Sequence, residues 1–198
     1  MNEVEVTVNN LLKKLNDDGL LLKNQYPDTS DLKIFERHII TTKMLVLLLR
    51  TRGTPENKEK FSNAMKNFGF DKEHVNLLPW IVELQLLLGS YELLKRTLIQ
   101  VIDLENIPNL KPKSTLGDII GKLNHRLKQN FFKNFIDNEL RNALGHDDWW
   151  IENELTFCYK TKNSEPKKLT LEKFSEIVKN HEKFSKSFYE NYGNQYCN

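Results

Sequence analysis

Apolar residues recur at steps of three and four along most of the chain, a spacing that places them on one face of an α-helix. Glycine, proline, serine and threonine separate these periodic segments, as expected at helix ends. The predicted helices span approximately residues 3–16, 31–53, 55–69, 79–103, 115–127, 130–145 and 171–189. The first segment leaves a second interpretation open, because Val4, Val6 and Val8 alternate with polar residues as they would in a short strand.

Individual residues mark several of the predicted boundaries. Gly53 is expected to end the second helix as a left-handed cap, and Pro79 is expected in the first turn of the long fourth helix. Ser114 is expected to cap the fifth helix, after a proline-containing linker at residues 106–113. The sixth predicted helix, from Asn130, carries a run of apolar residues inward and ends near Gly145.

The pattern changes after the sixth helix. Leu155, Phe157 and Tyr159 alternate with polar residues, residues 163–166 suit a turn, and residues 168–170 can return as a second strand. The sequence therefore predicts an all-α helical bundle with a small β-hairpin before the C-terminal helix. We expect a single domain over residues 1–198, with residues 1–29 as a candidate N-terminal addition.

Composition narrows the classes of protein that fit. Hydrophobic residues make up 39% and charged residues 28% of the chain, which is ordinary for a folded soluble protein. The net charge of +2 provides no overall field that attracts nucleic acid or anionic lipid, so any RNA binding must be local. Two cysteines are too few for a disulfide framework, and the longest apolar runs are far below membrane-spanning length. We expect a cytoplasmic protein that does not associate with membranes.

The run Arg-Asn-Ala-Leu-Gly-His at residues 141–146 is the main candidate for chemistry. It places a permanent cation, Arg141, near a titratable imidazole, His146, a pairing suited to phosphate esters. Asn142 lies four residues before His146, so their side chains share a helix face. In a continuous helix Arg141 and His146 would point about 140° apart. Either the helix breaks near Gly145, or two protomers build the site across a two-fold axis.

The same residues also fit a purely structural role. Gly145 and His146 suit the end of a helix, where glycine caps and a cation meets the negative pole. In a chain of this composition, about half a match to this arginine–histidine spacing is expected by chance. The spacing alone is therefore weak evidence for a site. Asp147 and Asp148 would repel a polyanion unless they point away or pair with basic residues.

Candidate substrate contacts follow the motif. Trp149 can stack on a base, and Lys160 and Lys162 near the hairpin turn can contact an RNA backbone. The alternative is that Trp149 and Trp150 pack the hairpin onto the bundle and that the lysines are only solvated. The sequence has no zinc-binding spacing of histidine and cysteine and no glycine-rich phosphate loop, so we expect neither a metal nor a cofactor.

The segment Leu140–His146, together with the predicted helix from Ser114, the hairpin and the last helix, resembles the HEPN superfamily, whose hallmark is Arg, four to six residues, then His. The resemblance covers roughly residues 30–189. It implies a helical bundle that forms a homodimer with the two motifs facing each other across a cleft. Many members are metal-independent endoribonucleases of toxin–antitoxin, abortive-infection and CRISPR defence systems. Others have no shown catalysis and serve as binding or assembly modules.

The resemblance implies roles for three residues. Arg141 would stabilise the charge that builds on the scissile phosphate, His146 would act as general base or acid, and Asn142 would orient or bind. The main hypothesis is an endoribonuclease of single-stranded RNA, a toxin or defence effector with an antitoxin or nucleotidyltransferase as partner. The alternatives are a non-catalytic HEPN-like binding or dimerisation module, and a structural protein in which His146 is a simple cap.

Overall fold

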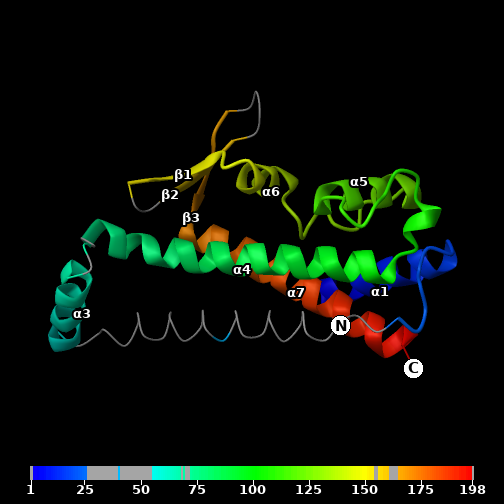
Figure 1. Ribbon diagram of the computed structural model, residues 1–198, viewed down its shortest axis with the longest axis horizontal. Helices are drawn as coiled ribbons and strands as arrows, with labels where there is room; N and C mark the ends of the chain where they lie inside the picture. The colour runs from blue at the N-terminus through cyan, green and yellow to red at the C-terminus, as the bar shows by residue number, and fades with distance from the viewer. Residues whose placement is uncertain are drawn as a thin grey trace. The chain divides into compact units, whose positions relative to one another are not determined.

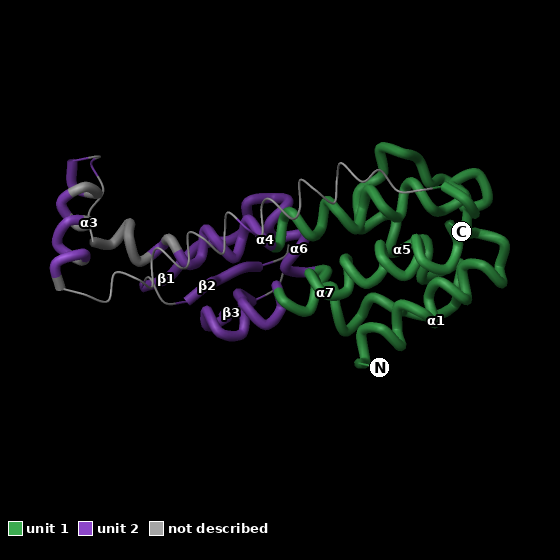
Figure 2. Tube along the Cα trace, turned by 90° about the horizontal axis from the view of Figure 1, so that it is seen from below, with its two compact units in different colours: residues 1–35, 87–138, 179–198 green, residues 36–86, 139–178 purple. Residues whose placement is uncertain are grey.

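The structure is a computed structural model that describes residues 2–25, 40, 55–67, 69, 72–153, 156–160 and 165–197. Its elements, in chain order, are α1 (Glu3–Asp17), α3 (Pro55–Asn67), α4 (Lys72–Val101), the 3-10 helix η2 (Leu104–Asn106), α5 (Leu116–Leu127), α6 (Asn138–Gly145), β1 (Trp149–Glu152), β2 (Thr156–Tyr159), β3 (Lys167–Thr170) and α7 (Leu171–Tyr196) (Figure 1). The chain divides into two compact units that alternate along the sequence (Figure 2). Unit 1 comprises Met1–Phe35, Leu87–Asn138 and Lys179–Asn198, and unit 2 comprises Glu36–Leu86 and Glu139–Val178.

The prediction of an all-α bundle with a hairpin is wrong, because the described residues include a three-stranded antiparallel sheet of order β1-β2-β3. Strands β2 and β3 form the predicted hairpin, and β1 adds the strand that was not foreseen. Strand β1 reads Trp-Trp-Ile-Glu, so it shows no alternation of apolar and polar residues. The reason is that apolar side chains lie on both faces of this strand, which removes the usual signal. The fold is therefore mostly helical with a small sheet.

Helix α1 is part of the core of unit 1. Asn2 and Glu5 form a capping box at its start, which satisfies two backbone N–H groups and favours a helix over the strand alternative. Its inward face is fully buried at Val8, Leu11, Leu12 and Leu15. The candidate N-terminal addition at residues 1–29 thus contributes apolar core to this unit.

The segment after α1 is held by the end of α7. The hydroxyl of Tyr192 donates a hydrogen bond to the carbonyl oxygen of Leu22, and the N–H of Asn24 donates to the carbonyl oxygen of Tyr196 at 2.9 Å. At the surface, Gln195 Nε2 donates to Asn9 Oδ1 at 2.8 Å. These bonds join the two ends of unit 1 through residues that are far apart in the chain.

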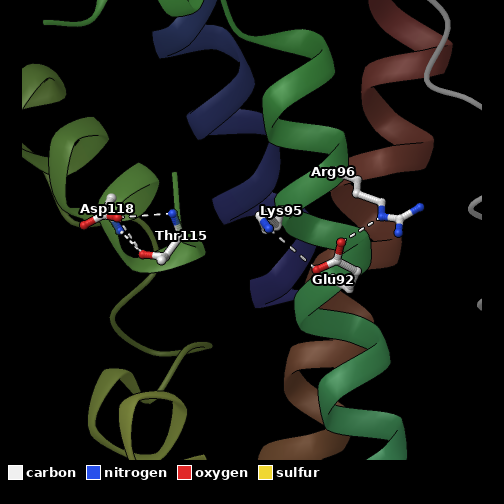
Figure 3. A network of polar contacts seen from close by, with 5 residues as sticks. All are labelled: Glu92, Lys95, Arg96, Thr115 and Asp118. Atoms are coloured by element: carbon white, nitrogen blue, oxygen red, sulfur yellow. Dashed lines mark hydrogen bonds and ion pairs between the residues drawn. The ribbon is translucent and has the colours of Figure 1, made fainter. Parts of the chain in front are cut away.

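Local hydrogen bonds define the beginning of α5 (Figure 3). Thr115 Oγ1 accepts the N–H of Asp118 at 3.2 Å, and the Asp118 carboxylate accepts the N–H of Thr115 at 3.1 Å. The N-cap is therefore Thr115, one residue after the predicted Ser114, because only Thr115 has an acid three residues later.

On α4, Glu92 accepts a hydrogen bond from Arg96 Nε at 2.8 Å (Figure 3).

The predicted helix from Asn130 is wrong in its first half. Residues 130–137 are irregular, and α6 begins only at Asn138. Asn130 Oδ1 accepts the N–H of Phe132 at 3.1 Å, a local bond that competes with helix formation. The apolar residues of this stretch still enter the core, where the rings of Phe132 and Phe135 lie 5.7 and 5.0 Å from that of Phe184.

A polar cluster is buried in unit 1 around His181 of α7. The His181 side chain is fully buried, its Nδ1 lies 3.2 Å from Ser185 Oγ, and its ring meets that of Tyr91 at 4.3 Å and 88°. Ser185 Oγ also lies within hydrogen-bonding distance of the carbonyl oxygen of Ser90, at 3.2 Å. Among the described residues, no hydrogen-bond partner lies near His181 Nε2. Burial lowers the pKa of His181 to about 3, because desolvation disfavours the charged imidazolium.

The core of unit 2 is aromatic and lies on one face of the sheet. The ring of Phe157 on β2 lies 5.4 Å from Trp149, 5.9 Å from Trp80 and 4.7 Å from Phe174. Trp80, Phe157 and Phe174 are almost completely buried. Helix α4, which supplies Trp80, starts at Lys72, so the expectation that Pro79 lies in the first turn is wrong. Proline here costs one interior hydrogen bond, and the burial of the following Trp80 offsets that cost.

Two further predicted helices are confirmed, at α3 and α7, the second extending to Tyr196. The predicted helix over residues 31–53, with Gly53 as its cap, lies outside the described residues except for Ile40, which is helical and exposed. Across the described part of the chain, no helix is both long enough and apolar enough to cross a membrane.

Candidate functional site

The Arg-to-His run lies on α6, which ends at Gly145 as the sequence predicts. The N–H of His146 donates to the carbonyl oxygen of Asn142 at 3.1 Å, so helical winding continues through His146. The left-handed residue is Asp147, with φ 56°, and the N–H of Asp148 returns to the carbonyl oxygen of Ala143 at 2.9 Å. Helical hydrogen bonding thus extends one residue past Gly145, so the chain does not turn back at this glycine.

This winding separates Arg141 from His146 within one chain. Five helical steps place their side chains about 140° apart around the helix axis. Arg141 instead approaches its neighbour, since its Nη2 donates a hydrogen bond to Asn142 Oδ1. Arg141 is half-buried, whereas Asn142 and His146 are exposed. The structure therefore brings together Arg141 and Asn142, and it places Asn142 and His146 on one helix face.

The two acidic residues after the histidine have different surroundings. Asp147 is exposed, and Asp148 is half-buried. The carbonyl oxygen of Asp148 accepts the N–H of Lys160 at 3.1 Å, which extends the ladder of β1 and β2 by one pair. Side chains opposite each other in such a ladder project to the same face, so Asp148 and Lys160 share one face of the sheet. Asp148 thus stays an acidic neighbour of the motif.

The adjacent tryptophans project to opposite faces of the sheet. The ring of Trp149 stacks on Phe157 at 5.4 Å and 14°, so it is half-buried in the core of unit 2. Trp150 keeps 38% of its surface exposed. The sequence-predicted substrate contact at Trp149 is therefore engaged in packing. The exposed ring is that of Trp150, because neighbouring strand residues alternate between the two faces.

The predicted lysines are only partly described. Lys160 is exposed at the end of β2, and Lys162 lies outside the described residues. On β3, Lys167 Nζ lies 2.9 Å from Glu139 Oε2, and Lys168 Nζ lies 2.6 Å from Glu152 Oε2. Each of these strand lysines thus has an acidic partner at the surface.

Sequence reasoning missed a cluster of Glu152, Cys158 and Lys168 on the outer face of the sheet. The hydrogen bond and the charge of Lys168 lower the pKa of the Glu152 carboxyl. Burial and the nearby Glu152 charge raise the pKa of the Cys158 thiol. A thiol held protonated in this way is a poor nucleophile and metal ligand. The alternation of β2 could have placed Cys158 beside Lys168, but only once the register with β3 was known.

The described side chains include no group of three or more histidine, cysteine or carboxylate residues arranged to hold a metal ion. The polar side chains of the motif on and after α6 are those of Arg141, Asn142 and His146. Of these, the imidazole is the side chain that can serve as a general acid or base.

The fold and the site together define a mostly helical protein whose candidate residues lie where α6 runs into a three-stranded sheet (Figure 1). Comparison with protein-family models, with curated proteins and with solved structures found no match. The resemblance of residues 140–146 to the HEPN motif therefore stays a prediction from the sequence.

Proposed function

We propose that the protein is a metal-independent endoribonuclease of HEPN type that cleaves single-stranded RNA in the cytoplasm as a homodimer. The observation that supports this most is the exposed imidazole of His146, one helical turn after the hydrogen-bonded pair of Arg141 and Asn142. A general base together with a permanent cation is the minimum required for transfer at a phosphodiester.

The reaction needs no group beyond these side chains. One imidazole takes the proton of a ribose 2′-hydroxyl, and the 2′-oxygen forms a bond to the adjacent phosphorus. The bond from phosphorus to the 5′-oxygen of the next nucleotide breaks, and an imidazolium gives that oxygen a proton. The products are a 2′,3′-cyclic phosphate and a 5′-hydroxyl. Arg141 stabilises the negative charge that accumulates on the phosphate oxygens during the step.

A second copy of the chain is required because one helix cannot direct both groups at one phosphate. Across a two-fold axis, His146 of one protomer can lie opposite Arg141 of the other, and the two imidazoles can serve as base and acid. In this arrangement each cleft contains residues from both protomers. Monomeric protein is then expected to be inactive.

The test is cleavage of a labelled single-stranded RNA in the presence of EDTA, with detection of the cyclic phosphate. We expect His146→Ala and Arg141→Ala to lose activity by at least about 100-fold, since general acid–base catalysis contributes about 10²–10⁴-fold. His125→Ala, which removes an exposed imidazole of α5, is the matched control. Mixing the two inactive variants should restore part of the activity if one His146 and one Arg141 from different protomers suffice, with water in place of the second imidazole. Intact RNA with wild-type protein, or full activity of His146→Ala, refutes the proposal.

A free nuclease of this kind would damage its own cell, so we infer a role as a toxin or defence effector restrained by an antitoxin or a nucleotidyltransferase. Growth arrest on expression of the wild type, absent with His146→Ala, is the expected result. Equal growth of both strains would refute the toxin role.

A second candidate function is a non-catalytic binding or dimerisation module. The specific observation in its favour is that Arg141 is half-buried with Nη1 enclosed by protein, so part of the guanidinium is withdrawn from solvent. Preserved dimerisation and partner binding without any cyclic-phosphate product would support this function.

A further inference from the structure

The outer face of the sheet carries an exposed aromatic ring that the core does not use. Residues paired across an antiparallel ladder project to one face, so the register puts Trp150, Cys158 and Lys168 in a row across β1, β2 and β3. Trp149 and Phe157 fill the opposite face. Cys158, the next residue of this row, is buried, whereas Trp150 keeps 38% of its surface exposed. Part of the Trp150 side chain therefore faces solvent on this side of the sheet.

A lysine stands next to this ring on the same face. The bond from the N–H of Lys160 to Asp148 continues the ladder one pair beyond Trp149 and Tyr159. Lys160 thus lies diagonally across from Trp150, a separation of about 7–8 Å between backbone positions. Its side chain is exposed, whereas Lys168 is held by Glu152 at 2.6 Å. Lys160 is accordingly the better placed of the two to meet an added anion.

We infer that this face is a subsite for an unpaired nucleobase, with the Trp150 ring stacked on the base and Lys160 bound to the neighbouring phosphate. An aromatic platform with an adjacent cation is how proteins hold single-stranded nucleic acid, since every base offers a π-face. A duplex hides those faces within its own stack, so the subsite selects single strands. The inference rests on the proposed function, and it names where that RNA is held.

The position of the subsite agrees with cleavage at His146. Trp150 follows His146 by four residues, and both belong to unit 2. A base stacked on Trp150 would lie near the first residues of β1, where the chain arrives from α6. The exposed side chains of Lys160 and His146 would then follow the RNA backbone from the subsite to the scissile phosphate.

The test separates binding from cleavage by using a fluorescent 2′-O-methyl oligoribonucleotide, which cannot undergo attack by a 2′-hydroxyl. We expect Trp150→Ala to weaken binding about 5- to 100-fold, the loss expected for one stacked base. Trp150→Phe should keep most of the affinity. Lys160→Gln should lower the slope of log affinity against log salt by about 0.7, the value for one phosphate contact. Leu88→Ala truncates another exposed apolar side chain and is the control.

The outcomes distinguish the subsite from the catalytic proposal. Affinity of Trp150→Ala equal to that of wild type overturns the subsite, whether or not the wild type cuts RNA. Binding that depends on Trp150, with no cleavage of ordinary RNA, supports the subsite and overturns the catalysis. Absence of RNA binding by the wild type overturns both. If Trp150→Ala binds RNA normally but no longer forms the same oligomer as wild type, the face contacts protein. That outcome also overturns the subsite.

Discussion

The buried imidazole of His181 makes a sharp prediction about stability against pH. In the native protein burial lowers the pKa of His181 to about 3. In the unfolded chain a histidine titrates at about 6.5. As the pH falls below that value the unfolded state takes up a proton and the native state does not, so acid favours unfolding. The stabilisation from keeping His181 neutral is complete above about pH 6.5 and is lost progressively toward pH 3.

The magnitude follows from linkage. Each pH unit in this window costs about 1.4 kcal/mol for one proton, so lowering the pH from 7 to 4.5 costs roughly 2.5 kcal/mol. Solvent does not screen this effect, because the His181 side chain is fully buried. The Tyr91 ring and the Ser185 hydroxyl, which contact the imidazole of His181, are both uncharged groups.

The assay is urea unfolding followed by circular dichroism at several pH values. We expect His181→Gln and His181→Leu to lose stability at pH 7 but to show a shallower acid dependence, so that the difference from wild type shrinks by about 2.5 kcal/mol at pH 4.5. The His181→Gln variant provides the test if His181→Leu does not fold. His125→Gln is the control, because it shows how far the loss of a surface histidine changes the slope of stability against pH. Curves for wild type and both His181 variants that stay parallel over this range would refute the reasoning.

Three further predictions concern stability and are checked by thermal or urea unfolding. Gly145→Ala should stabilise the protein by about 0.5–1 kcal/mol, because Gly145 is helical and a Cβ there meets nothing within 4 Å; a loss of stability would contradict this. Asp147→Gly should also stabilise, by up to about 1 kcal/mol, since φ at Asp147 is 56°; no gain would mean that the Asp147 side chain compensates. Phe157→Ala should cost about 3–5 kcal/mol, because its buried ring joins the aromatic core of unit 2; a cost below about 1 kcal/mol would refute that role.

Much of the helical structure could be predicted from the sequence, since burial on one face leaves a regular period. The capping residues of α1 and the buried face of α5 are local signals of this kind. Strand β1 could not be found in the same way. Its side chains are apolar on both faces, and its identity depends on pairing with β2. The irregular stretch after Asn130 was mistaken for helix because the burial of its phenylalanines mimics a helical period.

The candidate site shows the same limit. Arg141, Asn142 and His146 could be singled out from the sequence because their chemistry and order are local. The choice between Trp149 and Trp150 depends on which face of a strand each occupies, and that requires the register of the sheet. The end of α6 at Gly145 agrees with the prediction, but the left-handed residue after the helix is Asp147 rather than Gly145.

The hydrogen bond between Tyr192 and Leu22 also bears on how the chain folds during synthesis. It joins residues 170 positions apart, and unit 1 is complete only when both ends are present. At about 5–20 residues per second, the ribosome needs about 10–30 s to make the intervening chain. During that time the apolar face of α1, which includes Leu11 and Leu15, has no α7 to complete its unit. The nascent helix is therefore a natural binding segment for chaperones at the ribosome, and unit 1 is expected to fold only late in translation.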